Sequence, residues 1–306
     1  MQMEHRELTV QAADGIELAV RRLGPLGAPA TIVYVHGLLT DSNYWTPLTD
    51  CLDQRLDGGV AQVVYDQRGH GNSGRPHRRL TTTMHHLVED LDTVLTHASG
   101  SVLLVTHSAG SLLAHAWAER YPHRAAKLSG LVIFNGSAEF PEFASLPKLY
   151  RTLPRRLHRW RHGPLDPLSA AAAALLDRRF RRTSTRRGHP RHPTPGTRCD
   201  PRVVTDILGA YSHTSLSTEV AEQLRSVPSF VIAAEHDHVV PATQSLRLAD
   251  KIWADCEIVP GAGHSLPHTD PERASQFILQ ALDIAYHDAA HDHDWTDPVT
   301  TLGDQP

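Results

Sequence analysis

The feature that most restricts the fold of this chain is a strand, a serine and a helix that follow one another without a linker. Residues 102–107 form an apolar run, Val-Leu-Leu-Val-Thr-His, of the kind found in strands that are covered on both faces. Residues 109–121 have a helical composition, and Pro122 is expected to end that helix. With a single residue for the turn, Ser108 must adopt a strained backbone conformation that leaves its hydroxyl exposed. We therefore predict a sharp strand-to-helix turn with Ser108 at its tip.

Apolar runs and helical stretches alternate on both sides of this turn, which is typical of strands and helices wound into a mostly parallel sheet. The first two runs differ, because they flank Asp14-Gly15, a pair that favours an antiparallel hairpin. The predicted strands are residues 8–10, 16–21, 31–36, 60–66, 102–107, 128–135, 229–234 and 257–259, and the predicted helices are residues 43–56, 83–97, 109–121, 243–252 and 271–285. The sequence therefore predicts an α/β fold.

This alternation is interrupted in the middle of the chain. Residues 151–202 hold 14 arginines and only three acids, which is about +11 in formal charge, so the rest of the chain carries about −15. We predict that residues 138–211 are an Arg-rich helical cap inserted into a core made of residues 1–137 and 212–286. Residues 287–306 are rich in His, Asp, Thr and Pro, and we predict that they form a disordered tail.

Two interpretations of the Arg-rich segment remain open. Its guanidinium groups can hold an anionic group of a substrate, such as a phosphate, a carboxylate or a CoA tail. Charge blocks of this kind are also common in solvated loops that bind nothing. Prolines interrupt the arginines, and neither a helical stripe nor a recognition motif is present, so we expect no nucleic acid or membrane surface as a partner.

A nucleophilic serine needs a base that takes its proton and an acid that orients the base. Asp237 follows the predicted strand at residues 229–234, and His264 lies in a glycine-rich loop after the last predicted strand. Both residues come just after strand ends, where the loops of an open sheet gather at its carboxyl edge. We therefore predict that Ser108, Asp237 and His264 are the catalytic residues.

Other residues near these positions are weaker candidates. The chain has 22 histidines and 34 acidic residues, so residue type alone does not identify the catalytic ones, and their position after strand ends must do so. Glu235 and Asp270 are the rivals of Asp237 for the role of the acid. His236 and His238 flank Asp237 and are expected to be its neighbours rather than substitutes for the base. A serine that merely caps a helix is the alternative interpretation of the strand-to-helix turn.

Two backbone amides are needed to stabilise the oxyanion that forms when a serine attacks a carbonyl. The residue after the serine supplies one, and the loop after the third strand supplies the other. These residues are Ala109 and Leu38, and Gly37 is expected to turn the backbone so that the Leu38 amide points inward. Small residues are also wanted two places before and after the serine; Gly110 fits, whereas Thr106 replaces the usual glycine.

The sequence resembles the α/β-hydrolase superfamily, and in particular its capped serine esterases and lipases. The resemblance rests on His36-Gly37, the Ser108 turn, Asp237, Gly263-His264 and the segment at residues 66–74, which reads Asp-Gln-Arg-Gly-His-Gly-Asn-Ser-Gly. That segment is similar to the D-x-R-G-x-G-x-S motif of the family, whose role is structural.

The resemblance covers residues 8–137 and 217–285, and the Arg-rich middle of the chain matches no family that we can name. The family resemblance implies an eight-stranded, mostly parallel sheet with helices on both faces and a cap inserted after the sixth strand. Family members that dehalogenate or open epoxides use an aspartate nucleophile, so Ser108 argues against both activities.

From these residues we expect hydrolysis of a carboxylic ester through an acyl-enzyme, with a small-molecule acyl compound as substrate and no cofactor or metal ion. An acyl thioesterase, a C–C hydrolase and a proline aminopeptidase would use the same three residues. A non-catalytic, ligand-binding member of the fold is the alternative outside enzymology, since a fold does not determine a function.

Composition adds limits on location and on metal binding. The longest purely apolar run, residues 170–176, is far shorter than the ~20 residues of a membrane-spanning helix, so we expect no membrane span. The charged N-terminus lacks the apolar region of a signal peptide, which predicts a cytoplasmic protein. The three cysteines show no metal-ligand spacing, and His287 and His291 are more typical of a solvated tail than of a metal site.

Overall fold

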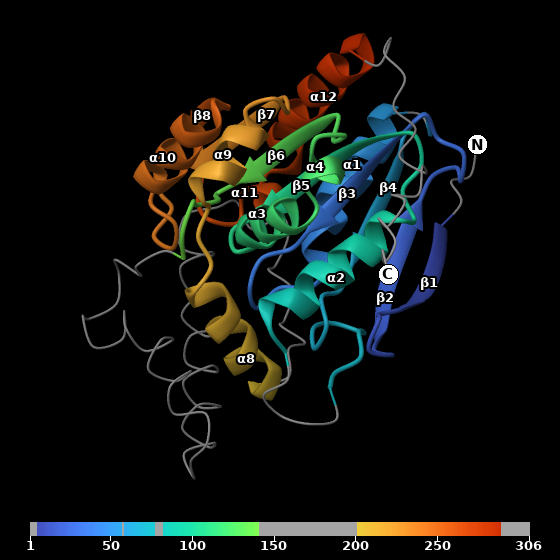
Figure 1. Cartoon of the computed structure of the whole chain (residues 1–306). Coiled ribbons are helices and arrows are strands. Elements are labelled where there is room, and N and C mark those ends of the chain that lie inside the picture. Colours follow the sequence, from blue (N-terminus) through green and yellow to red (C-terminus); the bar gives the residue numbers. More distant parts are fainter. Residues whose placement is uncertain (1–4, 57, 77–81, 141–200, 289–306) are drawn as a thin grey trace, which may run out of the picture.

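The computed structural model of the chain describes residues 5–56, 58–76, 82–140 and 201–288. The strands in these residues form one sheet in the order β1-β2-β4-β3-β5-β6-β7-β8 (Figure 1). β1, β2 and β4 pair antiparallel in turn, and every other neighbouring pair is parallel. The strands are β1 His5–Gln11, β2 Glu17–Leu23, β3 Ala30–Val35, β4 Ala61–Tyr65, β5 Ser101–His107, β6 Gly130–Phe134, β7 Ser229–Ala234 and β8 Asp255–Val259. The predicted eight-stranded, mostly parallel sheet is therefore confirmed.

Helices cover both faces of the sheet (Figure 1). Helices α2, α3, α9 and α10 pack on one face, and α1, α11 and α12 pack on the other. The helices are η1 Ser42–Trp45, α1 Thr46–Leu56, α2 Met84–Leu95, α3 Gly110–Arg120, α4 Pro122–Ala125, α8 Pro201–Ser212, α9 Thr218–Leu224, α10 Ala242–Ile252, α11 Leu266–Thr269 and α12 Pro271–Asp288. Within the described residues, none of these helices has both the length and the apolar composition that crossing a bilayer requires.

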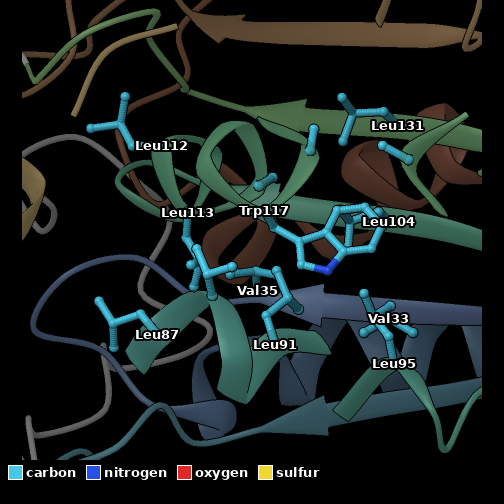
Figure 2. Close-up of a cluster of buried hydrophobic side chains, with 14 of the residues drawn as sticks. Val33, Val35, Leu87, Leu91, Leu95, Leu104, Leu112, Leu113, Trp117 and Leu131 are labelled. Carbon is cyan, nitrogen blue, oxygen red and sulfur yellow. The ribbon is translucent and has the colours of Figure 1, made fainter. Parts of the chain in front are cut away.

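The two faces of β3 show why its sequence is apolar throughout. Successive side chains of a strand point to opposite faces, so Val33 and Val35 join one core cluster while Ile32 and Tyr34 join the other, and all four are fully buried. Burying one such side chain contributes about 1.5–3 kcal/mol. Figure 2 shows the first cluster, where β3 faces a row of α2 leucines spaced four residues apart, namely Leu87, Leu91 and Leu95.

Most predicted elements are present, and the differences have local causes. The strand predicted at residues 229–234 has the bounds of β7. The helix predicted at residues 43–56 is divided into the 3-10 helix η1 and the α-helix α1. Pro47 lies in the first turn of α1, where a residue without a backbone N–H is tolerated because the amides of that turn have no acceptor within the helix. Pro122 does end α3 as expected, but it also begins the short helix α4.

The segment predicted as an Arg-rich cap falls between β6 and β7, and residues 141–200 of it lie outside the described residues. Its last part is α8, which packs on the core through Val203, Ile207 and Tyr211. The cap itself stays a prediction. The disordered tail also stays a prediction, because residues 289–306 lie outside the described part of the chain, although α12 continues three residues past the predicted end at residue 285.

Candidate active site

Every residue predicted for the site lies a few positions after the carboxyl end of a strand. Leu38 follows β3, Ser108 follows β5, Asp237 follows β7 and His264 follows β8. These strands are parallel, so their carboxyl ends meet at the same edge of the sheet. The topology therefore gathers four loops that are far apart in the sequence.

Ser108 occupies the sharp turn that was predicted between β5 and α3. Its φ is 52°, a left-handed conformation that is unfavourable for a residue with a Cβ atom by about 1–3 kcal/mol. The turn is held because the Ser108 amide donates to the carbonyl of Phe134 at 3.0 Å, while the Ser111 hydroxyl donates to the Ser108 carbonyl at 2.7 Å. The Ser108 side chain is only half-buried, and its hydroxyl has no hydrogen-bond partner among the described residues.

The residues two places before and after Ser108 show how closely the turn is packed. A Cβ atom at Gly110 would lie 2.6 Å from the carbonyl oxygen of Val35, so only glycine lets α3 begin so close to β3. Thr106, which replaces the usual first glycine, is fully buried, and its hydroxyl has no partner in the described part of the chain. The turn therefore accepts a β-branched residue, at the cost of a buried hydroxyl without a hydrogen bond.

Asp237 and His264 are in direct contact, with 2.7 Å between Asp237 Oδ2 and His264 Nδ1. The other carboxylate oxygen, Oδ1, accepts hydrogen bonds from the amides of Val239 (2.7 Å) and Val240 (2.9 Å). These bonds hold the carboxylate in one orientation. Because a carboxylate can only accept, His264 carries its proton on Nδ1, and its Nε2 is left to act as a base.

The loop that carries His264 is attached to the serine turn by two residues that sequence reasoning missed. His107 Nε2 and Asn135 Nδ2 each lie 2.8 Å from the carbonyl oxygen of His264. The Asn135 Oδ1 accepts a hydrogen bond from the amide of Ala234 at 2.8 Å, which adds the end of β7 to the same cluster. The His107 and His264 rings are 4.8 Å apart between centroids, so the residue before Ser108 packs against His264.

The two predicted oxyanion amides belong to Leu38 and Ala109, and neither has a hydrogen-bond acceptor among the described residues. We expected Gly37 to turn the backbone, but the positive φ of this loop is at Leu39 (61°). Glycine is needed at position 37 for a different reason: a Cβ atom there would lie 3.1 Å from Ser108 Cβ, and even closer to the His107 ring. The Leu38 loop is therefore packed directly against the serine turn.

The loop at residues 66–74 has a structural role, as the family resemblance implied. Asp66 accepts hydrogen bonds from the amides of Ser42 (2.7 Å) and Asn72 (2.8 Å), and so joins this loop to the start of η1. A Cβ atom at Gly71 would lie 2.1 Å from the Asp66 carboxylate. The carboxylate is therefore enclosed by backbone, and both of its oxygens accept from amides of the two loops.

A buried ion-pair cluster fixes the same loop to the β1–β2 hairpin and to α2. Arg68 binds Asp90 through two contacts of 2.6 Å, and it also binds Asp14 at 2.7 Å. Arg68 and Asp90 are almost completely buried. Asp14 is exposed at the hairpin turn, but both carboxylates are paired with Arg68, and the three side chains lock elements together rather than act on a substrate.

The rival residues have other partners. Glu235 is exposed and accepts a hydrogen bond from the amide of Gly261 at 2.8 Å. Asp270 lies at the start of α12, where its carboxylate accepts from the amide of Arg273 at 3.3 Å. His236 and His238 are exposed, beside Asp237 in sequence but not bound to it. The acid in contact with His264 is thus Asp237.

Burial lowers the pKa of four other histidines, because the charged imidazolium is poorly solvated inside the protein. The pKa of His70 falls to about 3 and that of His115 to about 4, while those of His36 and His107 are also lowered. All four are therefore neutral at physiological pH. A neutral His107 can donate from Nε2 to the His264 carbonyl, which agrees with its contact there.

The described residues contain no group of three or more His, Cys, Asp or Glu side chains suited to holding a metal ion. The side chains that gather at the carboxyl edge of the sheet are instead a hydroxyl, an imidazole and a carboxylate. Together with two unpaired amides, these groups can attack a carbonyl carbon and stabilise the resulting oxyanion.

Comparison with known proteins shows the family of the chain. Residues 30–271 match the family model described as alpha/beta hydrolase fold. The chain is 24% identical over 260 residues to a putative carbamate hydrolase, RutD, of Acinetobacter baylyi, covering 82% of this chain and 92% of that protein. It is 28% identical over 153 residues to a proline iminopeptidase of Saccharolobus solfataricus, covering 46% and 47%. A putative aryl esterase from Burkholderia cenocepacia superposes with a TM-score of 0.67 at 25% identity, covering 91% and 100%.

Proposed function

Because the chain belongs to the α/β-hydrolase family, we propose that it is a serine hydrolase that cleaves carboxylic esters through an acyl-enzyme. Ser108 is the nucleophile, His264 the general base and Asp237 the acid that orients it. The observation that supports this most is the 2.7 Å contact between Asp237 and His264, whose ring packs 4.8 Å from that of His107, the residue before the left-handed Ser108. A serine that an imidazole can deprotonate, with a carboxylate to orient that imidazole, is the arrangement that activates a hydroxyl.

The reaction proceeds in two halves. The Ser108 oxygen attacks the ester carbonyl carbon while its proton passes to His264 Nε2, and the amides of Leu38 and Ala109 donate to the oxyanion. When the tetrahedral intermediate collapses, the C–O bond to the alcohol breaks and His264 returns the proton to the leaving alkoxide. A water then attacks the acyl-enzyme with His264 again as base, which releases the carboxylic acid and regenerates Ser108.

Ester bonds are the first choice because a solved structure at 25% identity is named as a putative aryl esterase. The two sequence relatives are named for carbamate hydrolase and iminopeptidase activities, and carbamates and peptides both contain a carbonyl bonded to nitrogen. Thioesters need the same three residues as well. The choice among these substrates is decided by experiment, with matched esters, thioesters, carbamates and N-terminal prolyl amides of increasing acyl length.

Labelling with a fluorophosphonate probe tests the proposal before any substrate is known. We expect the wild-type protein to react at Ser108 and the Ser108→Ala variant not to react. Ser101→Ala is the matched control, since Ser101 begins the same strand at the opposite edge of the sheet and should leave labelling unchanged. Ester hydrolysis should fall by several orders of magnitude in Ser108→Ala alone. Wild-type protein that neither labels nor hydrolyses would support the non-catalytic alternative.

A further inference from the structure

The oxyanion loop is held in place by the imidazole of His36. His36 Nε2 accepts a hydrogen bond from the amide of Gln67 at 3.0 Å, so the ring carries its proton on Nδ1. That nitrogen lies 2.8 Å from the carbonyl oxygen of Gly37, which also accepts from the Thr40 hydroxyl at 2.8 Å. Together with the amide of Thr40 at 3.4 Å, these two side-chain donors hold the Gly37 carbonyl in one direction.

The direction of this carbonyl determines where the Leu38 amide points. The Gly37 C=O and the Leu38 N–H belong to one planar, trans peptide group, so the two bonds point in opposite directions. With the carbonyl held toward His36 and Thr40, the amide must point away from them, and it has no acceptor among the described residues. His36 thus orients the amide to which we assign half of the oxyanion hole.

Gln67 holds the preceding peptide group. Its Nε2 donates to the His36 carbonyl at 2.7 Å, and its Oε1 accepts from the hydroxyl of Tyr211 at 2.9 Å. The side chains of His36, Gln67 and Tyr211 are almost completely buried. The two ends of a side-chain amide have nearly the same shape, so the donor on Tyr211 determines which end of Gln67 faces the loop. Without it, Oε1 is buried without a donor, and the end of Gln67 that faces the loop is held only by its contacts with His36.

Tyr211 lies in α8, near the end of the segment predicted as an Arg-rich cap, whereas His36 and Gln67 belong to the core. We propose that Tyr211 and Gln67 are positioning residues that transmit the placement of α8 to the oxyanion amide of Leu38. The inference rests on the proposed function, because it assigns a catalytic purpose to that amide. It makes α8, the last part of the segment predicted as a cap, a determinant of the reaction rate.

Tyr211→Phe tests the proposal, with Tyr65→Phe as its matched control. The Tyr65 hydroxyl is equally buried near the same His36 ring and has no hydrogen-bond partner among the described residues, so its removal breaks no hydrogen bond of the loop. For Tyr211→Phe we expect kcat to fall about tenfold, less than the ~10²–10³-fold cost of deleting an oxyanion donor. The KM should stay within about twofold, because the oxyanion exists only in the transition state.

A double-mutant cycle shows whether Tyr211 acts through Gln67. In a Gln67→Met background the amide is already absent, so adding Tyr211→Phe should lower kcat no further. A simple alkylboronic acid, which forms a tetrahedral adduct with an active serine, should lose affinity about in parallel with kcat. The proposal is overturned if Tyr211→Phe matches Tyr65→Phe, or if its effect is equally large in both backgrounds.

A readout that needs no substrate separates this inference from the proposed function. The amide NMR resonance of Leu38, assigned with 15N-leucine labelling and a Leu38→Ile variant, should shift in Tyr211→Phe but not in Tyr65→Phe. An unshifted Leu38 resonance would overturn the relay even in an active enzyme. Conversely, a shifted resonance in a protein that fails to label at Ser108 would support the relay and refute the proposed function.

Discussion

His115 makes the fold sensitive to acid, and replacing it with leucine should remove a predictable part of that sensitivity. The side chain lies in α3, fully buried, and neither ring nitrogen has a partner in the described part of the chain. Burial lowers its pKa from 6.5 to about 4. The unfolded chain therefore binds the proton more tightly than the folded one, so stability is complete above pH 6.5 and falls as the pH approaches 4.

With these pKa values, the free energy of unfolding falls by about 2 kcal/mol between pH 7.5 and pH 5, and the total loss approaches ~3 kcal/mol below pH 4. Urea unfolding followed by tryptophan fluorescence at pH 7.5, 6 and 5 measures it. The stability advantage of His115→Leu over wild type should grow by about 2 kcal/mol across that range. His123→Gln, an exposed histidine on α4, is the control and should keep the wild-type slope. Equal slopes for His115→Leu and wild type would refute the reasoning.

Four further outcomes are expected. Asp237→Asn should lower kcat about 10³–10⁴-fold by allowing the wrong tautomer of the base, whereas Glu235→Gln should stay within about twofold in the same ester assay. Asn135→Asp should lower kcat about tenfold or more, because an oxygen replaces the donor that lies 2.8 Å from the His264 carbonyl; unchanged kcat would mean that this contact does not position the base. Thr106→Val should raise the free energy of unfolding, measured in urea, by about 1 kcal/mol, since it removes a buried hydroxyl without a partner. If the arginines of residues 151–202 hold an anionic group, KM for anionic acyl substrates should rise with salt while KM for neutral ones does not; equal salt responses would exclude that docking.

Helices and strands that depend mainly on neighbouring residues in the sequence were predicted well. β7 has the predicted bounds because its apolar run lies between Pro228, which cannot donate to a sheet, and the charged Glu235. β8 was predicted too short, since its first residues, Asp255 and Cys256, are exposed at the edge of the sheet and do not look like a buried strand. The helices α9 and α11 were not predicted at all, because four- to seven-residue helices give too little periodicity to detect.

Residues that hold the site through distant contacts were not predicted. Asn135 meets His264 across 129 positions, and Tyr211 meets Gln67 across 144. Asparagine, glutamine and tyrosine are common in many roles, and nothing in their spacing marks them. A signal existed only for Asn135, the polar last residue of the strand predicted at residues 128–135, which directly follows β6 at the edge where the site residues gather.

The sequence by itself determined the α/β fold, the sharp turn at Ser108 and the candidates Asp237 and His264, since these depend on local backbone preferences and on the order of strands along the chain. Only the tertiary structure decided that Asp237 rather than Glu235 contacts His264, and that Leu39 rather than Gly37 takes the left-handed conformation. Which polar atoms meet depends on distances of a few tenths of an ångström between loops packed from distant parts of the chain, and hydrogen-bond geometry at that scale is not encoded in periodicity.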